Sequence, residues 1–311
     1  MKNKILQLKK ELSAVILAHY YTTPEVQDVA DFVGDSLALS EKAATTDAKI
    51  ILFAGVHFMA ETAKILSPQK TVLIPDLEAG CSLADSCPAP QFAEFLKKYP
   101  DHTVISYVNT TADVKALTDI IVTSSNAVQI VDSLPKDTKI VFGPDRNLGR
   151  YVAEMTGRPD MVIWDGACHV HQRFSVEKIV ELKKLHPNAK LLVHPECPQP
   201  VVLMADYVGS TAALLKASAM DEAQTFIVAT ESGIIYEMQK ASPGKIFIPA
   251  PPDDSDCGCN DCSFMKLNTL AKIANALETL SPELTLDEEV IAKAAKPIKR
   301  MLEISRELKL I

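Results

Sequence analysis

One stretch of the chain occurs three times, and this repetition constrains the fold more than any other feature. The first copy, VILAHYYTTPEVQDVADFVGDS, covers residues 15–36. Aligning the copies on one aspartate in each gives the anchors Asp31, Asp119 and Asp206, which are 88 and 87 residues apart. A repeat of this kind indicates a chain built from similar units, and 311 residues leave room for three of them.

Each copy carries polar side chains at matching positions relative to its aspartate. Position −12 holds His19, Tyr107 and His194, position −10 holds Tyr21, Asn109 and Glu196, and position +5 holds Ser36, Ser124 and Thr211. Ring, acid and hydroxyl side chains at equivalent places indicate that each unit contributes chemistry from the same part of its fold.

Short apolar runs alternate with amphipathic segments in every unit. A helix with a Lys-Lys pair opens each one: ILQLKKEL, FAEFLKKY and IVELKKLH. Three strands per unit are expected, at 15–18, 50–53 and 72–74, at 104–106, 140–142 and 161–163, and at 191–193, 226–228 and 246–248. After the first strand, apolar residues at helical spacing (Val26, Val29, Ala30, Val33) predict a helix. The pattern predicts an α/β fold of parallel βαβ units.

We therefore expect three similar α/β/α sandwich domains with small parallel sheets, covering residues 1–83, 84–170 and 171–263. Two further helices within 264–311 are expected to pack back on the first unit. Ligands bind beyond the carboxyl ends of parallel strands, where the repeated polar residues stand. A pseudo-threefold arrangement would bring these ends to one cavity, whereas a linear array would keep them apart.

The bulk composition limits the classes of function. A net charge of −8 without a clustered basic face argues against nucleic-acid binding. No apolar run approaches the ~18 residues that a membrane span needs. The first residues, MKNKILQLKKEL, are charged throughout and lack an apolar signal region. We expect a cytoplasmic protein that does not insert into membranes.

The cysteines suggest a metal or cluster site. Their number is odd, and they stand at 81, 87, 168, 197, 257, 259 and 262. Cys81 and Cys168 lie 50 and 49 residues after their anchors, and the third unit offers Cys257, Cys259 and Cys262 at 51, 53 and 56. A single cysteine can simply be core packing. Three converging thiols favour zinc or a [4Fe–4S] cluster with one open iron.

Many motifs, in order from about residue 14 to 275, resemble the quinolinate synthase family. They include HYYTTPEVQDVADFVGDSLALS, DLEAGCSLADSC, VFGPDRNLGRYVA, WDGACHVHQRF, HPECPQPV, ADYVGST, TESG and CSFMKLNTL. The resemblance implies a [4Fe–4S] transferase of NAD biosynthesis, with three α/β/α units around a pseudo-threefold axis. Such an enzyme condenses iminoaspartate, supplied by L-aspartate oxidase, with dihydroxyacetone phosphate to give quinolinate, phosphate and water.

The resemblance also implies roles for particular residues. Cys81, Cys168 and Cys262 match the cluster ligands. The residues that match the substrate-contacting set are His19, Tyr21, Ser36, Tyr107, Asn109, Ser124, His171, His194, Glu196, Ser210 and Thr211.

We interpret Glu196 as the main proton-transfer group, with His194, His19 and Tyr21 as partners. The hydroxyls at Ser36, Ser124, Ser210 and Thr211 would bind anions at helix starts, although each could instead be an ordinary helix cap. The open iron would polarise a bound oxygen group.

The third ligand is open between two cysteines. Cys257 fits the repeat offset better, whereas Cys262 precedes the SFMKLNTL segment that resembles the family's ligand context. Loops tolerate insertions at small entropic cost, so we favour Cys262 and expect a helix start there to lower its pKa.

Two other classes of function stay in competition: a non-catalytic iron–sulfur or zinc sensor, and an iron–sulfur dehydratase acting on another substrate.

Overall fold

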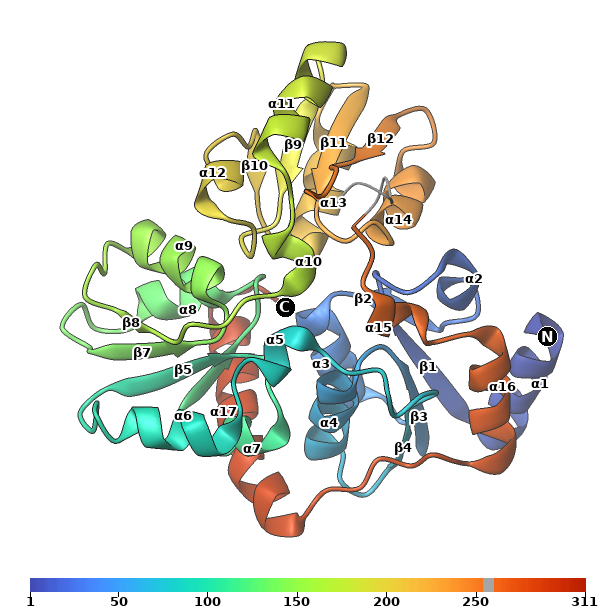
Figure 1. Cartoon of the computed structure of the whole chain (residues 1–311). Helices are drawn as coiled ribbons and strands as arrows, with labels where there is room; N and C mark the ends of the chain where they lie inside the picture. Colours follow the sequence, from blue (N-terminus) through green and yellow to red (C-terminus); the bar gives the residue numbers. More distant parts are fainter. Residues whose placement is uncertain (254–259) are drawn as a thin grey trace.

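The computed structural model describes residues 1–253 and 260–311, so Cys257 and Cys259 lie outside the described residues. The chain forms three lobes arranged around a common centre (Figure 1). Each lobe contains a four-stranded parallel sheet with helices on its faces. The predicted α/β class with three similar units is confirmed.

The first sheet has the strand order β2-β1-β3-β4. Its strands are β1 (Ala14–His19), β2 (Phe32–Gly34), β3 (Ile50–Ala54) and β4 (Thr71–Leu73). The helices of this unit are α1 (Lys2–Leu12), α2 (Pro24–Gln27), α3 (Ser36–Thr45), α4 (His57–Leu66) and α5 (Ser82–Asp85).

The second and third sheets repeat this order as β6-β5-β7-β8 and β10-β9-β11-β12. The second unit contains α6 (Ala89–Leu96), β5 (Thr103–Tyr107), α7 (Ala112–Lys115), β6 (Ile120–Val122), α8 (Ala127–Ser133), β7 (Ile140–Gly143), α9 (Arg146–Thr156), β8 (Val162–Ile163) and α10 (His169–Gln172). The third contains α11 (Val176–Leu185), β9 (Lys190–Val193), α12 (Gln199–Val202), β10 (Tyr207–Val208), α13 (Thr211–Met220), β11 (Thr225–Ala229), α14 (Ile234–Ala241) and β12 (Ile246–Pro249).

Each sheet has one strand more than we predicted, because the expected helix after the first strand is only a single turn. In the first unit, α2 ends at Gln27 and the chain returns to the sheet as edge strand β2. Asp31 causes this return: its N–H donates to Ile16 O over 2.9 Å, and its carboxylate accepts from Ile16 N over 2.7 Å. Phe32 and Val33 then pair with β1, as their β-branched and aromatic side chains favour.

The other two repeated aspartates do the same. Asp119 makes the same pair of hydrogen bonds with Val104, and Asp206 makes them with Leu191. The aspartate that anchors the repeat is therefore a structural residue. It fixes the position of the edge strand and does not line the cavity described below.

The C-terminal helices cover more than the first unit, which corrects our expectation for 264–311. After α15 (Ser263–Lys266), helix α16 (Leu270–Thr279) packs on α1 and β3 of the first unit. Helix α17 (Glu288–Glu307), red in Figure 1, packs between α4 of the first unit and β6 and α7 of the second. Its apolar stripe includes Ile298 and Met301, which join one core shared by the two units.

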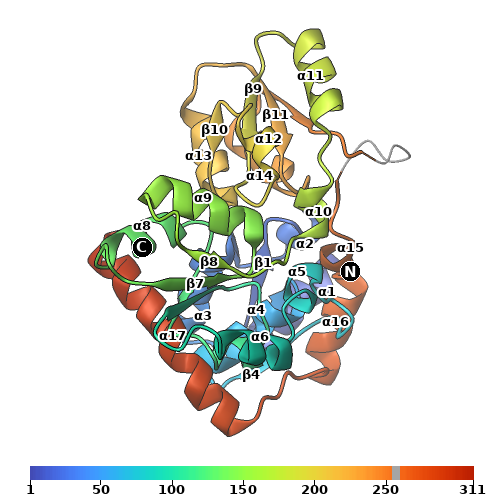
Figure 2. The same cartoon turned by 60° about the vertical axis from the view of Figure 1, so that its left-hand side comes forward.

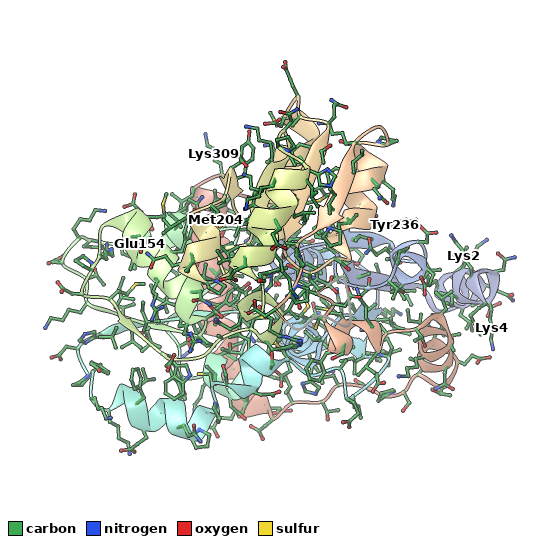
Figure 3. The ribbon with its side chains drawn as sticks, turned by 45° about the horizontal axis from the view of Figure 1, so that its top comes forward. Lys2, Lys4, Glu154, Met204, Tyr236 and Lys309 are labelled. Carbon is green, nitrogen blue, oxygen red and sulfur yellow. The ribbon has the colours of Figure 1, made fainter. Side chains whose placement is uncertain are left out.

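The third unit has apolar clusters of its own on the two faces of its sheet. Polar contacts on its rim link it to its neighbours. Tyr236 on α14 donates to Asp28 over 2.6 Å, and Gln199 donates to Glu154 over 2.8 Å. Tyr236 and Glu154 are labelled in Figure 3. Figure 2 shows this unit standing over the other two. Within the described ranges, no helix is both long and apolar enough to cross a membrane.

Candidate active site

A cavity of about 60 Å³ lies where the three units meet. His19 and Tyr107 are the last residues of β1 and β5, and His194 follows β9, so the carboxyl ends of all three sheets face this cavity. The residues predicted from the sequence that line it are His19, Tyr21, Ser36, Tyr107, Asn109, Ser124, His171, His194, Glu196 and Thr211. The units are thus closed around a centre and do not form a linear array.

Ser210 is the exception among the predicted residues. It is the N-cap of α13, where its Oγ accepts from Ala213 N over 3.2 Å. Ser125 donates its one hydroxyl hydrogen to Asp35 over 2.5 Å, so Ser210 Oγ is the donor in its 2.7 Å hydrogen bond with Ser125 Oγ. The cap interpretation therefore fits Ser210, which takes part in a link between all three units next to the cavity.

Three thiols line the cavity, one from each unit or its following segment. Cys81, Cys168 and Cys262 each stand immediately before a short helix, α5, α10 and α15 respectively. Burial raises the pKa of Cys81 to about 12, and burial also raises the pKa of Cys168 and of Cys262. Our expectation of a lowered pKa at Cys262 is wrong, because burial outweighs the field of a four-residue helix.

The donor set fits an iron–sulfur group. Bound metal reverses the preference for the neutral thiol, because a coordinating thiol is deprotonated. Cys87 and Cys197 are buried away from the three thiols and do not line the cavity. Beside the thiols, His171 Nδ1 and Glu196 Oε2 are buried and face each other over 3.4 Å, a distance longer than a regular hydrogen bond.

Glu196 is the central acid of the site. Its Oε1 accepts from the Tyr107 hydroxyl over 2.8 Å, and its Oε2 lies 3.4 Å from His171 Nδ1. Burial acts to raise the pKa of Glu196, but His171, and with it the hydrogen bond from Tyr107, outweigh burial and lower this pKa to about 2. We therefore infer an ionised carboxylate at neutral pH.

The two repeat-equivalent histidines are held in the same way. His19 Nδ1 accepts from Tyr21 N over 3.2 Å, and His194 Nδ1 accepts from Glu196 N over 3.3 Å. Since Nδ1 accepts, we infer that the proton is on Nε2, which makes each ring a hydrogen-bond donor. Burial lowers the pKa of both His19 and His194 to about 3, so both rings are neutral.

These buried histidines predict a loss of stability in acid. Between about pH 3 and 6.5 the unfolded chain binds protons that the folded chain does not, so stability falls as the pH falls. Between pH 6.5 and 5, each histidine should lower the free energy of unfolding by about 2 kcal/mol. Urea unfolding of the apoprotein at both pH values measures this. His194→Asn should reduce the dependence and exposed His186→Asn should not; an equal slope in all three proteins would contradict it.

Tyr21 bridges the first and third units. Its hydroxyl is hydrogen-bonded to Thr211 Oγ1 and to Thr230 Oγ1, each over 2.8 Å. Burial raises the pKa of Tyr21 well above its usual value, which keeps the phenol neutral. Thr230 also contacts His171 Nε2 over 2.9 Å, so one hydroxyl network joins residues that the sequence places far apart.

Two buried carboxylates that the sequence analysis missed hold the backbone of two cysteines. Cys168 N donates to Asp145 over 3.0 Å, and Cys262 N donates to Glu231 over 3.1 Å. Each acid lies two residues after its strand, β7 or β11. The repeat could have indicated them, since they stand 26 and 25 residues after their anchors, where the first unit has Val56.

We predict that these acids slow the loss of a metal group. Asp145→Ala or Glu231→Ala leaves a buried N–H unpaired, so a chelator should remove iron from the reconstituted protein about 10-fold faster. Iron release followed by absorbance measures this. Asp165→Ala is the control, because Asp165 is an acid of the second unit whose side chain is 83% exposed. Equal release from all variants would contradict the prediction.

A buried cavity lined by three thiols and a ring of histidine, tyrosine, glutamate and hydroxyl groups defines an α/β enzyme with a thiol-ligated cofactor site. The family model described as Quinolinate synthetase A protein matches residues 3–303. The chain is 60% identical over 301 residues to the quinolinate synthase of Synechocystis sp., covering 97% of this chain and 94% of that protein. The quinolinate synthase of Thermosynechococcus vestitus is 58% identical with the same coverage, and that of Nostoc sp. is 58% identical over 97% and 92%.

The chain therefore belongs to the quinolinate synthase family. The family predicted from the motifs is confirmed, as is the enzyme class, and an iron–sulfur cofactor fits the three thiols.

Proposed function

We propose that this protein condenses iminoaspartate with dihydroxyacetone phosphate to form quinolinate, releasing phosphate and water. It would do so with a [4Fe–4S] cluster held by Cys81, Cys168 and Cys262. The observation that carries the proposal is the convergence of one thiol per unit with the polar ring in one cavity. We also infer that L-aspartate oxidase supplies iminoaspartate. A cytoplasmic location agrees with the five free cysteines of the described residues.

The three thiols of the cavity and the quinolinate synthase family together support a cluster over a single zinc ion. Among the described residues, the donor atoms of Cys168, His171 and Glu196 lie within 4.8 Å of one another, so an imidazole and a carboxylate stand beside one thiol. With three thiols and no fourth among the described lining residues, one iron would remain open. When bound, such an iron supplies Lewis-acid activation of an oxygen group.

Hydroxyls and backbone N–H groups would bind the anionic substrates. No lysine or arginine is among the described residues that line the cavity. Ser36 and Thr211 are the first residues of the ten-residue helices α3 and α13, and Ser124 lies just before α8. Free N–H groups and the helix dipole favour negative charge at such termini. The Nε2–H groups of His19 and His194 add two neutral donors.

Glu196 would exchange protons with the substrates. Its carboxylate is ionised and buried. The Tyr107 hydroxyl donates a hydrogen bond to it and can keep that bond while the carboxylate gains or loses a proton. Tyr21 is a neutral phenol between two threonines and would donate to a substrate oxygen. Condensation, ring closure and dehydration all move protons, so an enclosed set of such groups suits the reaction.

The direct test is anaerobic reconstitution followed by assay. The protein should acquire iron and sulfide in equal amounts with broad visible absorption. It should then form quinolinate from dihydroxyacetone phosphate and an enzymatic source of iminoaspartate. A loaded protein without turnover would favour the sensor alternative, and turnover only of another hydroxy acid would favour a different dehydratase.

A further inference from the structure

A buried lysine behind the cavity has no role in the chemistry described above. Lys115, the last residue of α7, is fully buried. Its Nζ donates to the backbone carbonyl of Thr110 and lies 5.3 Å from the centre of the Phe58 ring. No carboxylate forms an ion pair with it in the described part of the chain. A buried lysine is rare unless it is paired, so this position needs an explanation.

The repeat supplies one, because Gln27 occupies the same position in the first unit. Both residues stand four places before the anchor aspartate of their unit. Gln27 Nε2 donates to Thr22 O over 2.9 Å, and Thr22 and Thr110 are equivalent, nine places before the anchor. Each threonine hydroxyl then donates over 2.9 Å to the last carbonyl of its strand, at His19 or Tyr107. One network therefore occurs in two units with different nitrogen donors.

These hydrogen-bond networks hold the backbone of two loops whose side chains line the cavity. The loop 19–22 carries His19 and Tyr21, and the loop 107–110 carries Tyr107 and Asn109. All four side chains line the cavity.

The third unit receives a nitrogen donor at this loop from a different part of the chain. Its equivalent residue is Val202, which has no donor. Asn147 of the second unit instead donates over 2.9 Å to Glu196 O. This carbonyl lies one place before Cys197, which is the residue equivalent to Thr22 and Thr110.

Each of the three substrate-facing loops thus accepts at least one hydrogen bond from a side-chain nitrogen. The loop 19–22 accepts more than one, because Gln27 also donates to Tyr20 O and Lys266 donates to Tyr21 O, each over 2.8 Å.

We propose that Lys115 and Gln27 are equivalent positioning residues, which fix the two loops by donating a hydrogen bond to Thr110 O and Thr22 O. Lys115 serves through its N–H and its reach, not through its charge. Glutamine in the first unit performs the same task without a charge. Removing the donor leaves a buried carbonyl unpaired, and a loop that carries two binding side chains then loses its fixed geometry.

The test compares Lys115→Gln, which copies the first unit, with Lys115→Met, which keeps the length and removes the donor. Hydrogen–deuterium exchange of residues 107–111 is the readout that does not depend on activity. Exchange in Lys115→Met should rise about 10-fold, the size expected for a lost buried hydrogen bond. Its Tm should fall by no more than a few degrees, because a single buried carbonyl loses its partner. Lys115→Gln should exchange like the parent.

On the reconstituted enzyme, Lys115→Met should raise the KM about 10-fold while the iron content is unchanged, and Lys115→Gln should restore the KM. Only this second readout rests on the proposed function. A parent protein that forms no quinolinate would refute that function and leave the exchange result to decide the positioning role.

Two results would overturn the proposal. Parent-like exchange in Lys115→Met would show that the loop does not depend on this donor. A Lys115→Gln protein as altered as Lys115→Met would show that the charge is required. If Lys115→Met does not fold, Gln27→Met and Gln27→Lys decide: the first should speed exchange of residues 19–23 and the second should not, and any other result overturns the proposal.

Discussion

Replacing Cys168 with serine should abolish the broad visible absorption of the reconstituted protein and its quinolinate synthesis. A serine hydroxyl stays protonated near neutrality and is a poor ligand for iron, so one of three protein ligands is lost. The same result is expected for Cys81→Ser and Cys262→Ser, because all three thiols line one cavity. Iron and sulfide counts after anaerobic reconstitution measure the effect.

Cys87→Ala is the matched control, since Cys87 is a buried cysteine outside the cavity and should keep both iron and turnover. A Cys81→Ser protein with full iron content and activity would contradict the assignment. For the third ligand, Cys262→Ser is compared with Cys257→Ser and Cys259→Ser. Loss of the cluster in Cys257→Ser alone would show that the repeat offset was the better guide.

Glu196→Gln should lower kcat about 10²–10⁴-fold while the cluster absorption is retained. Glutamine keeps the size of the side chain and can still accept from the Tyr107 hydroxyl, but it cannot hold or release the proton. The expected loss is in kcat, because the charge is needed when protons move. Steady-state kinetics on protein matched for iron content separates this from a binding defect.

Glu154→Gln is a control for the same substitution in the second unit (labelled in Figure 3), because Glu154 is not among the described residues that line the cavity. It should leave kcat unchanged. Near-normal turnover in Glu196→Gln would move the proton-transfer role to His19 or Tyr21, which line the same cavity.

Several features could be predicted because local sequence determines them. Strands such as β1 and β3 are short apolar runs between polar turns, and their expected bounds at 15–18 and 50–53 differ from the structure by one residue. The repeat spacing places His19, Tyr107 and His194 at equivalent strand ends. Parallel strands of equivalent units present equivalent ends, so the common cavity followed from the repeat once the units close around a centre.

Other features were decided by tertiary contacts. The segment at Val29 and Val33 has helical spacing, yet Asp31 pairs with Ile16 and draws the chain into the sheet edge. The amphipathic α17 has one apolar stripe, and only the closed arrangement offers it a groove between two units. Periodicity identifies the buried face of an element but not the surface that covers it.

The sequence by itself determined the α/β class, the three units, the family and which three thiols line the cavity. All of these depend on periodicity, spacing and motifs along the chain. The tertiary structure alone decided which polar residues support the site. Asp145 and Glu231 stand inside two of the quoted motifs, VFGPDRNLGRYVA and TESG, but the motifs alone assign them no role, and Lys115 looks like an ordinary surface residue. Their roles follow from burial next to one backbone N–H or carbonyl, and burial of a charged group depends on chain segments that meet only in the folded protein.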